Sequence, residues 1–243
     1  MRAVILAGGK GTRLHPYSLV LPKPLMPIGD APILEIGLRQ LRHYGFRDVT
    51  IAVGHMADLL MAMLGDGRSL GLKIRYAIED EPRGTIGPLA GMPEIVKEKS
   101  PVLLINGDTL TDLDFRAFAR AHAPGRAMVS VATYAKKVAI DLGVMDWDAS
   151  GALRGFREKP VISFNVSMGI YMMSPEVVDL IPPREPFGFD DLMHACIKKK
   201  LAVRSHLHRG IWLDIGRPED YRTAVDTFEK RRIKFCPWER KVS

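Results

Sequence analysis

Residues 3–30 of the chain read AVILAGGKGTRLHPYSLVLPKPLMPIGD. The apolar run Ala3 to Ala7 is typical of a buried strand in a parallel sheet, and it ends abruptly in a loop of glycines and basic residues. Glycines let a ligand approach the backbone, and the free amides of such a loop point at anionic oxygens. Arg13 adds charge, and Lys23 stands between two prolines that stiffen its backbone. The stretch predicts a strand that leads into a polyphosphate site.

Spacing excludes two better-known phosphate loops. The pattern G-x-G-x-x-G, read from Gly9, would need a glycine where Leu14 stands, and G-x-x-x-x-G-K-[ST] does not occur in the chain. For the glycines alone, an ordinary tight turn is the alternative. The nearby Arg13 and Lys23 favour the phosphate site.

Strand-like and helix-like stretches alternate after this loop. This rhythm predicts a mostly parallel sheet with helices on both faces, and ligands bind such sheets beyond the carboxyl ends of the strands. Asp108 follows one strand end and the glycine loop follows another, so we expect both in one crevice. The expected strands are 49–53, 73–78 and 102–105, and the expected helices are 33–44, 57–64 and 85–96.

The second half of the chain is richer in strands. We expect them to extend the same sheet and to cover the site with a small lobe, with a hairpin turn at 148–151. The expected strands are 128–134, 142–147, 153–157, 167–173, 203–208 and 212–213, and the expected helices are 176–180, 190–200 and 218–230.

Composition indicates one globular domain over residues 1–243, with a first half of about 1–125 and a second of about 126–230. The chain has 243 residues, 47% of them hydrophobic, and only two cysteines. No signal peptide or membrane-length apolar run is present, so a cytoplasmic protein is expected.

The formal charge of +7 is spread along the chain without a nucleic-acid motif, so it favours anionic small molecules over nucleic acid or a membrane. Residues 230–234, KRRIK, are the exception. They are a solvated helix end or a patch for a partner or membrane. His206 and His208 lack the further ligands that a structural metal needs.

Two segments, LAGGKGTRL at 6–14 and PKPLMPI at 22–28, resemble the signature of the sugar-1-phosphate nucleotidyltransferases, or NDP-sugar pyrophosphorylases. Matches continue in the family's order nearly to the end of the chain. They are EPRGTIGPL at 81–89, INGD at 105–108, FREKP at 156–160, NVSMGIY at 165–171 and WLDIGRPEDY at 212–221. The resemblance implies a Rossmann-like mixed, mostly parallel sheet flanked by helices, with a small sugar-binding lobe.

The implied reaction joins a nucleoside triphosphate (NTP) to a sugar 1-phosphate and gives an NDP-sugar and pyrophosphate. The nucleophile is already an anion, so positioning and electrostatics carry the catalysis. By resemblance, Arg13 and Lys23 are catalytic. The nucleotide-binding residues are Leu6, Ala7, Gly8, Gly9, Gly11, Thr12, Arg13, Glu79, Gly84, Thr85 and Gly107. The sugar-phosphate-binding residues are Gly143, Glu158, Lys159, Asn165 and Gly169, with Lys159 as the phosphate clamp.

Asp108 and Asp214 are, by resemblance, the two metal-binding aspartates. Both stand beside apolar residues, where an unpaired charge is costly, and Mg²⁺ takes carboxylate and phosphate oxygens together. The alternative for Asp108 is a turn or helix-cap carboxylate.

The segment around Glu79 and Gly84 is where the family reads the base. The Glu79 carboxylate can accept two hydrogen bonds from guanine, which favours GTP as the nucleotide. In this respect the chain is similar to the mannose-1-phosphate and heptose-1-phosphate guanylyltransferases. A solvent-facing Glu79 is the alternative, and Arg83 and Ile86 depart from the commoner family wording. UTP, dTTP or CTP, a non-sugar phosphoalcohol acceptor, a non-catalytic nucleotide-sensing subunit and a homo-oligomer all stay open.

Overall fold

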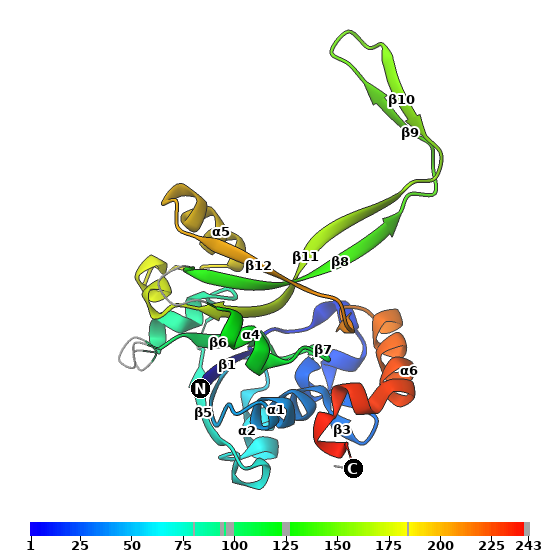
Figure 1. Ribbon diagram of the computed structural model, residues 1–243. Helices are drawn as coiled ribbons and strands as arrows, with labels where there is room; N and C mark the ends of the chain where they lie inside the picture. The colour runs from blue at the N-terminus through cyan, green and yellow to red at the C-terminus, as the bar shows by residue number, and fades with distance from the viewer. Residues whose placement is uncertain (80, 93–94, 96–99, 123–126, 184, 241–243) are drawn as a thin grey trace.

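The computed structural model describes residues 1–79, 81–92, 95, 100–122, 127–183 and 185–240. A seven-stranded sheet runs through its centre in the order β12-β8-β11-β6-β1-β4-β5 (Figure 1). The strands are β1 (Arg2–Ala7), β4 (Asp48–Val53), β5 (Lys73–Ile78), β6 (Val102–Asn106), β8 (Val129–Ala139), β11 (Val161–Met173) and β12 (Val203–His208).

Most neighbouring strands of this sheet are parallel. β1 pairs in parallel with β4 and β6, β4 with β5, and β8 with β12. β11 alone runs antiparallel to its two neighbours, β6 and β8. The expected mixed, mostly parallel α/β fold is confirmed, and the second-half strands extend the same sheet.

Side chains of β1 alternate between the two faces of the sheet, as a strand of period two requires. Ile5 packs with α1 (Ile33–His43), α2 (Ala57–Leu64) and α4 (Phe115–Ala121) on one face. Val4 packs on the other face with α5 (Phe189–Lys198). Short 3₁₀ turns complete this second layer at Gly87–Gly91 and Pro175–Leu180.

A third cluster joins the two ends of the chain. The long helix α6 (Pro218–Phe235) packs its Phe228 against Leu14 and Ile28, which lie in the segment after β1. β13 (Trp212–Asp214) pairs antiparallel with β7 (Thr109–Thr111), and the short β2 (Pro27–Ile28) pairs with β3 (Ala31–Pro32). Further 3₁₀ turns are Thr12–Leu14, Tyr17–Leu19, Lys23–Leu25, Arg68–Leu70 and Pro237–Glu239.

A two-stranded arm projects from the body. β8 and β11 continue past the sheet edge, and β9 (Val144–Trp147) and β10 (Leu153–Arg157) form a hairpin at their far end (Figure 1). β9 and β10 pair with each other and with no strand of the main sheet. The lobe expected over the site is therefore an arm that stands away from it.

Several element bounds differ from those expected. The helix expected at 85–96 is a 3₁₀ turn at Gly87–Gly91, and residues 93–94 and 96–99 lie outside the described part. Glycine and proline at 87–88 explain this, since both are poor in helix interiors. The expected helix at 176–180 is also a 3₁₀ turn, and helix 218–230 extends to Phe235. No helix in the described residues is long and apolar enough to cross a membrane.

Candidate active site

The glycine loop after β1 packs against Lys23. Gly11 adopts a left-handed conformation with a φ of 62°, and a Cβ placed there would lie 3.2 Å from the Cβ of Lys23. Lys23 begins a 3₁₀ turn between its two prolines, and only 9% of it is exposed. Gly11 of the loop and Lys23 thus pack directly on each other.

Gly107 places Asp108 beside this unit. Its N–H donates to the carbonyl of Leu6 at 2.8 Å, and a Cβ at this position would come within 3.0 Å of the same oxygen. A side chain would push the strand end away, so glycine is needed here for close approach rather than for an unusual backbone angle. Asp108 follows directly, at the carboxyl end of β6.

Lys23 and Asp108 form an ion pair between the Nζ and Oδ2 atoms. The lysine side chain is 10% exposed and the aspartate side chain 26% exposed. A buried ammonium needs a partner of opposite charge, and Asp108 supplies it. The pair joins the P-K-P segment to the I-N-G-D segment, which lie 85 positions apart in the sequence.

Asp214 comes to the same place through the β13–β7 pairing. It lies opposite Thr109, the residue that follows Asp108. Two positions further, the Cβ position of Gly216 lies 3.7 Å from a guanidinium nitrogen of Arg13. The W-L-D-I-G segment therefore borders both the glycine loop and Asp108.

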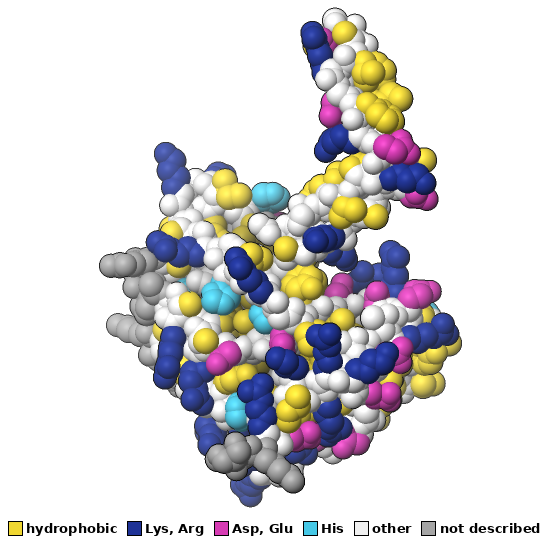
Figure 2. Space-filling model, turned by 45° about the vertical axis from the view of Figure 1, so that its right-hand side comes forward, with side chains coloured by type: hydrophobic (Ala, Val, Ile, Leu, Met, Phe, Trp, Pro, Cys, Tyr) yellow, Lys and Arg dark blue, Asp and Glu magenta, His cyan; other side chains and the backbone are white. Residues whose placement is uncertain are grey.

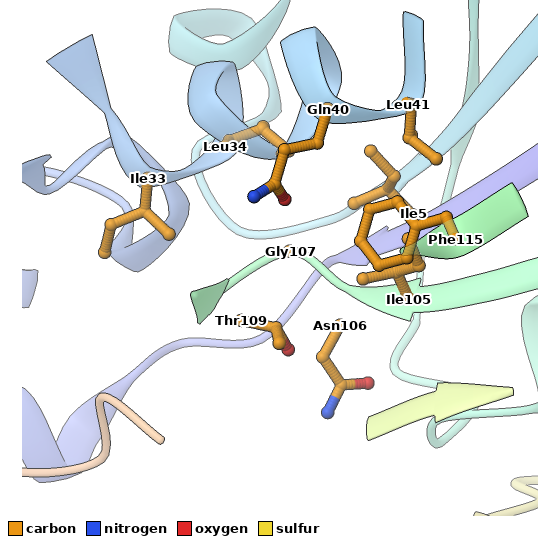
Figure 3. Close-up of a pocket in the computed structure, with 11 residues that line it drawn as sticks. Ile5, Ile33, Leu34, Gln40, Leu41, Ile105, Asn106, Gly107, Thr109 and Phe115 are labelled. Carbon is orange, nitrogen blue, oxygen red and sulfur yellow. The ribbon is translucent and has the colours of Figure 1, made fainter. Parts of the chain in front are cut away.

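A small pocket lies directly beneath this site (Figure 3). Its wall is mostly apolar, with Ile5, Ile33 and Leu34 among its residues, and Gly107 and Thr109 lie below the α1 side chains in the view. Gln40 of α1 donates to the carbonyls of Thr111 and Phe235 at 2.7 and 2.8 Å. These contacts join α1 to the ends of β7 and α6, so the pocket is part of the supporting core.

Glu79 also lies against the glycine loop. One carboxylate oxygen stands 3.2 Å from the Cβ position of Gly8, and the other accepts the N–H of Arg83 at 3.3 Å. Burial raises the pKa of Glu79 above its usual value, while the Arg83 hydrogen bond lowers it. The carboxylate is half-buried at the loop rather than fully in solvent.

Gly84 and Thr85 pack on the segment before α5. Gly84 has a φ of 77°, and a Cβ there would lie 2.8 Å from the carbonyl oxygen of Phe187. The hydroxyl of Thr85 accepts the N–H of Phe189 at 2.9 Å. Thr85 thus accepts the first N–H of α5, while its own chain continues into the 3₁₀ turn Gly87–Gly91 in place of the expected helix.

The sugar-side residues are divided between the body and the arm. Gly169, with a φ of 72°, contacts the side chain of Asn106 and so borders the Asp108 turn. Asn165 is exposed on β11, where the arm begins.

The other three lie together at the elbow of the arm. The Cβ position of Gly143 is 3.3 Å from a carboxylate oxygen of Glu158, and Lys159 pairs with the exposed Asp141 at 3.0 Å. Lys159 lies ten positions before Gly169 in the sequence, which along an extended strand is about 30 Å. The structure therefore does not bring Gly143, Glu158 and Lys159 to the glycine loop of their own chain.

The family model for nucleotidyl transferases matches residues 2–231. The chain belongs to the nucleotidyl transferase family. Its sequence is 33% identical to a mannose-1-phosphate guanyltransferase of Candida albicans over 227 residues, which make up 91% of this chain and 62% of that protein. It is 31% identical to a UTP–glucose-1-phosphate uridylyltransferase of Synechocystis over 252 residues, 96% of this chain and 65% of that protein. The chain thus spans less than two thirds of both relatives.

A solved structure of the same family fold agrees with this assignment. HddC from Yersinia pseudotuberculosis, complexed with GMP-PN, superposes with a TM-score of 0.71 at 26% identity. The match covers 93% of this chain and 99% of that one. The motif resemblance found in the sequence is thereby confirmed at the level of family and fold.

Three residues at this nucleotidyl transferase site were not assigned from the sequence. Asn106 meets Gly169, while Gly54 and His55 follow β4 and approach Gly8, whose carbonyl accepts the N–H of His55 at 3.4 Å. A Cβ at Gly54 would lie 3.1 Å from the same carbonyl. The available signal was their position, since all three lie at the carboxyl ends of β4 and β6, the two parallel neighbours of β1.

Proposed function

We propose that this chain transfers a nucleoside monophosphate from an NTP, with GTP favoured, to a mannose- or heptose-type sugar 1-phosphate. The observation that carries the proposal is the convergence of the glycine loop, Lys23, Asp108 and Asp214 at one edge of the sheet. Family membership and the mannose-1-phosphate guanyltransferase relative support it.

The chemistry suits these residues. A phosphate oxygen of the sugar 1-phosphate attacks the α-phosphorus of the NTP, the bond to the bridging oxygen breaks, and pyrophosphate leaves. No proton has to be removed from the nucleophile. Loop amides and the charges of Arg13 and Lys23 orient the triphosphate and stabilise the charge that develops on it.

Asp108 and Asp214 fit a Mg²⁺ site of the kind that proteins share with phosphates. Mg²⁺ is usually held by one or two carboxylates together with substrate phosphates and water. The described residues contain no cluster of three or more histidine, cysteine, aspartate or glutamate side chains that could hold a metal alone. Mg²⁺ bound by the two aspartates would neutralise charge around the α-phosphate.

For the base, we expect GTP to exceed ATP, UTP, dTTP and CTP by about a hundredfold in kcat/KM, because a site built on hydrogen bonds rejects bases that leave them unmade. Glu79, half-buried at Gly8, is the proposed acceptor for guanine. Glu79→Gln should reduce this preference to within about tenfold. The test is a pyrophosphate-release panel of the five nucleotides against several sugar 1-phosphates.

The panel also separates the alternatives. The uridylyltransferase relative, at similar identity, makes UTP with glucose 1-phosphate the second candidate, and a preference for that pair would reject the Glu79–guanine pairing. Retention of the full GTP preference by Glu79→Gln would reject it as well. If no sugar 1-phosphate or phosphoalcohol that is tested gives pyrophosphate release, a nucleotide-sensing subunit is favoured.

Lys159 is proposed as the clamp on the sugar phosphate. Lys159→Ala should raise the KM for the sugar 1-phosphate by about tenfold or more while changing kcat less, because it removes a contact that binds the acceptor about equally in the ground state and in the transition state. Lys136→Ala, at an exposed lysine lower on the same arm, is the matched control. An unchanged KM in Lys159→Ala would contradict the role.

A further inference from the structure

The arm, residues 136–165, exposes more apolar surface than a free element in water should. Nineteen large hydrophobic side chains are exposed in the described part of the chain, and eight of them lie on the arm. They are Val138, Leu142, Met145, Trp147, Leu153, Phe156, Val161 and Phe164. Figure 2 shows hydrophobic side chains gathered on one side of the hairpin and others nearer the base of the arm, with charged side chains between the two groups. Exposed patches of this kind mark interaction surfaces.

Strand register gathers four of these side chains on one face. Trp147 lies opposite Leu153, and Met145 lies opposite Phe156, so each pair shares a face. The bulge between Leu153 and Gly155 shifts the register by one residue and puts both pairs on the same side. The opposite face carries the Arg157–Asp146 ion pair at 3.4 Å. The hairpin is therefore amphipathic with its apolar face uncovered.

The same arm carries the sugar-side motif away from its own glycine loop. Glu158 and Lys159 lie at the elbow, about 30 Å along the strand from Gly169. A lysine side chain cannot bridge that distance. A second copy of this chain offers an identical glycine loop, and a symmetric exchange would cover both apolar arms at once.

The area of such an exchange is large enough for a stable dimer. Trp147 and Phe156 are 58% and 55% exposed. Aromatic side chains bury about 150–250 Å² each, so the exposed parts of these two side chains on each of two arms, with the surfaces they cover, give roughly 700–1,100 Å². The six other exposed hydrophobic side chains of each arm raise the total to roughly 1,200 Å² or more. Standard protein interfaces bury about that much.

We propose that the arm of one copy docks on a second copy of this chain and brings Glu158 and Lys159 to the glycine loop of that copy. This inference rests on the proposed function, because it assigns the acceptor side of the same site to the partner. Each site then contains Asp108 from one copy and Lys159 from the other.

Complementation between two variants tests the exchange. Asp108→Asn and Lys159→Ala each impair one side of the site, and we expect each to lower kcat/KM at subsaturating sugar 1-phosphate by about tenfold or more. The two are co-expressed with different tags and the hybrid is isolated through both. In an exchanged hybrid one site has both native residues, so about half of the wild-type kcat/KM per dimer should return. A hybrid no more active than its parents would show that the arm acts on its own chain and would overturn the proposal.

Sedimentation provides a test that does not depend on activity. The wild-type chain should sediment as a dimer at micromolar concentration, and Trp147→Ser/Phe156→Ser as a monomer. Ile197→Ser, which removes an apolar side chain that is 73% exposed on α5, should remain dimeric. A monomeric wild type, or a double variant that stays dimeric, would overturn the docking. An inactive wild type that dimerises through the arm would reject the proposed function alone.

Discussion

Replacing Asp108 with asparagine is expected to lower turnover by about 10²–10³-fold, the range found when one group that stabilises transition-state charge is removed. Asparagine keeps the size of the side chain but removes the charge that pairs with Lys23 and that would hold Mg²⁺. Asp214→Asn should act in the same direction. The measurement is kcat at saturating Mg²⁺ and substrates.

A matched control lies six residues away. Asp114 caps α4 by accepting the N–H of Ala117 at 2.8 Å, and asparagine caps helices about equally well. Asp114→Asn should therefore leave both turnover and melting temperature near the wild-type values. Asp108→Asn leaves Lys23 without its partner, so some stability is lost, and kcat must be compared below its melting temperature. Near-wild-type kcat in both Asp108→Asn and Asp214→Asn would reject the metal assignment.

Lys23→Ala should lower kcat by about a hundredfold or more, because its ammonium is expected to act on charge that develops in the transition state. Lys73→Ala is the control, since Lys73 is exposed at the amino end of β5, whereas the site lies at the carboxyl ends of the strands. Because Lys23 and Asp108 are in contact, the double variant Lys23→Ala/Asp108→Asn should lose less than the product of the single effects. A Lys23→Ala variant with normal kcat and only a raised KM for the NTP would contradict a catalytic role.

Much of the fold could be predicted because its signals are local. β5 and α2 lie where periodicity placed them, at Lys73–Ile78 and Ala57–Leu64. The rule that ligands bind at the carboxyl ends of parallel strands correctly predicts that Asp108 lies near the glycine loop. The Lys23–Asp108 pair follows from that meeting, although neither segment alone predicts the contact.

The arm could not be predicted in the same way. The alternation of apolar and polar residues at 142–147 and 153–157 indicates a hairpin. This pattern does not depend on whether the hairpin covers the site or projects from the body. The direction depends on how far β8 and β11 pair beyond the sheet, which is a long-range property. The contact of Thr85 could not be predicted for a similar reason, because its hydroxyl accepts the N–H of Phe189, over a hundred residues away.

The most direct test of the proposed transfer traces where the α-phosphate of the nucleotide goes. The chain is incubated with Mg²⁺, a mannose or heptose 1-phosphate and GTP labelled at the α-phosphorus, and the products are resolved by mass. We predict that the label appears in the sugar nucleotide, that unlabelled pyrophosphate forms in equal amount, and that both form about 10²–10³-fold more slowly in Asp108→Asn. If the label is released as free nucleoside monophosphate or stays in the NTP with every nucleotide and acceptor of the panel, this site is not a sugar-1-phosphate nucleotidyltransferase.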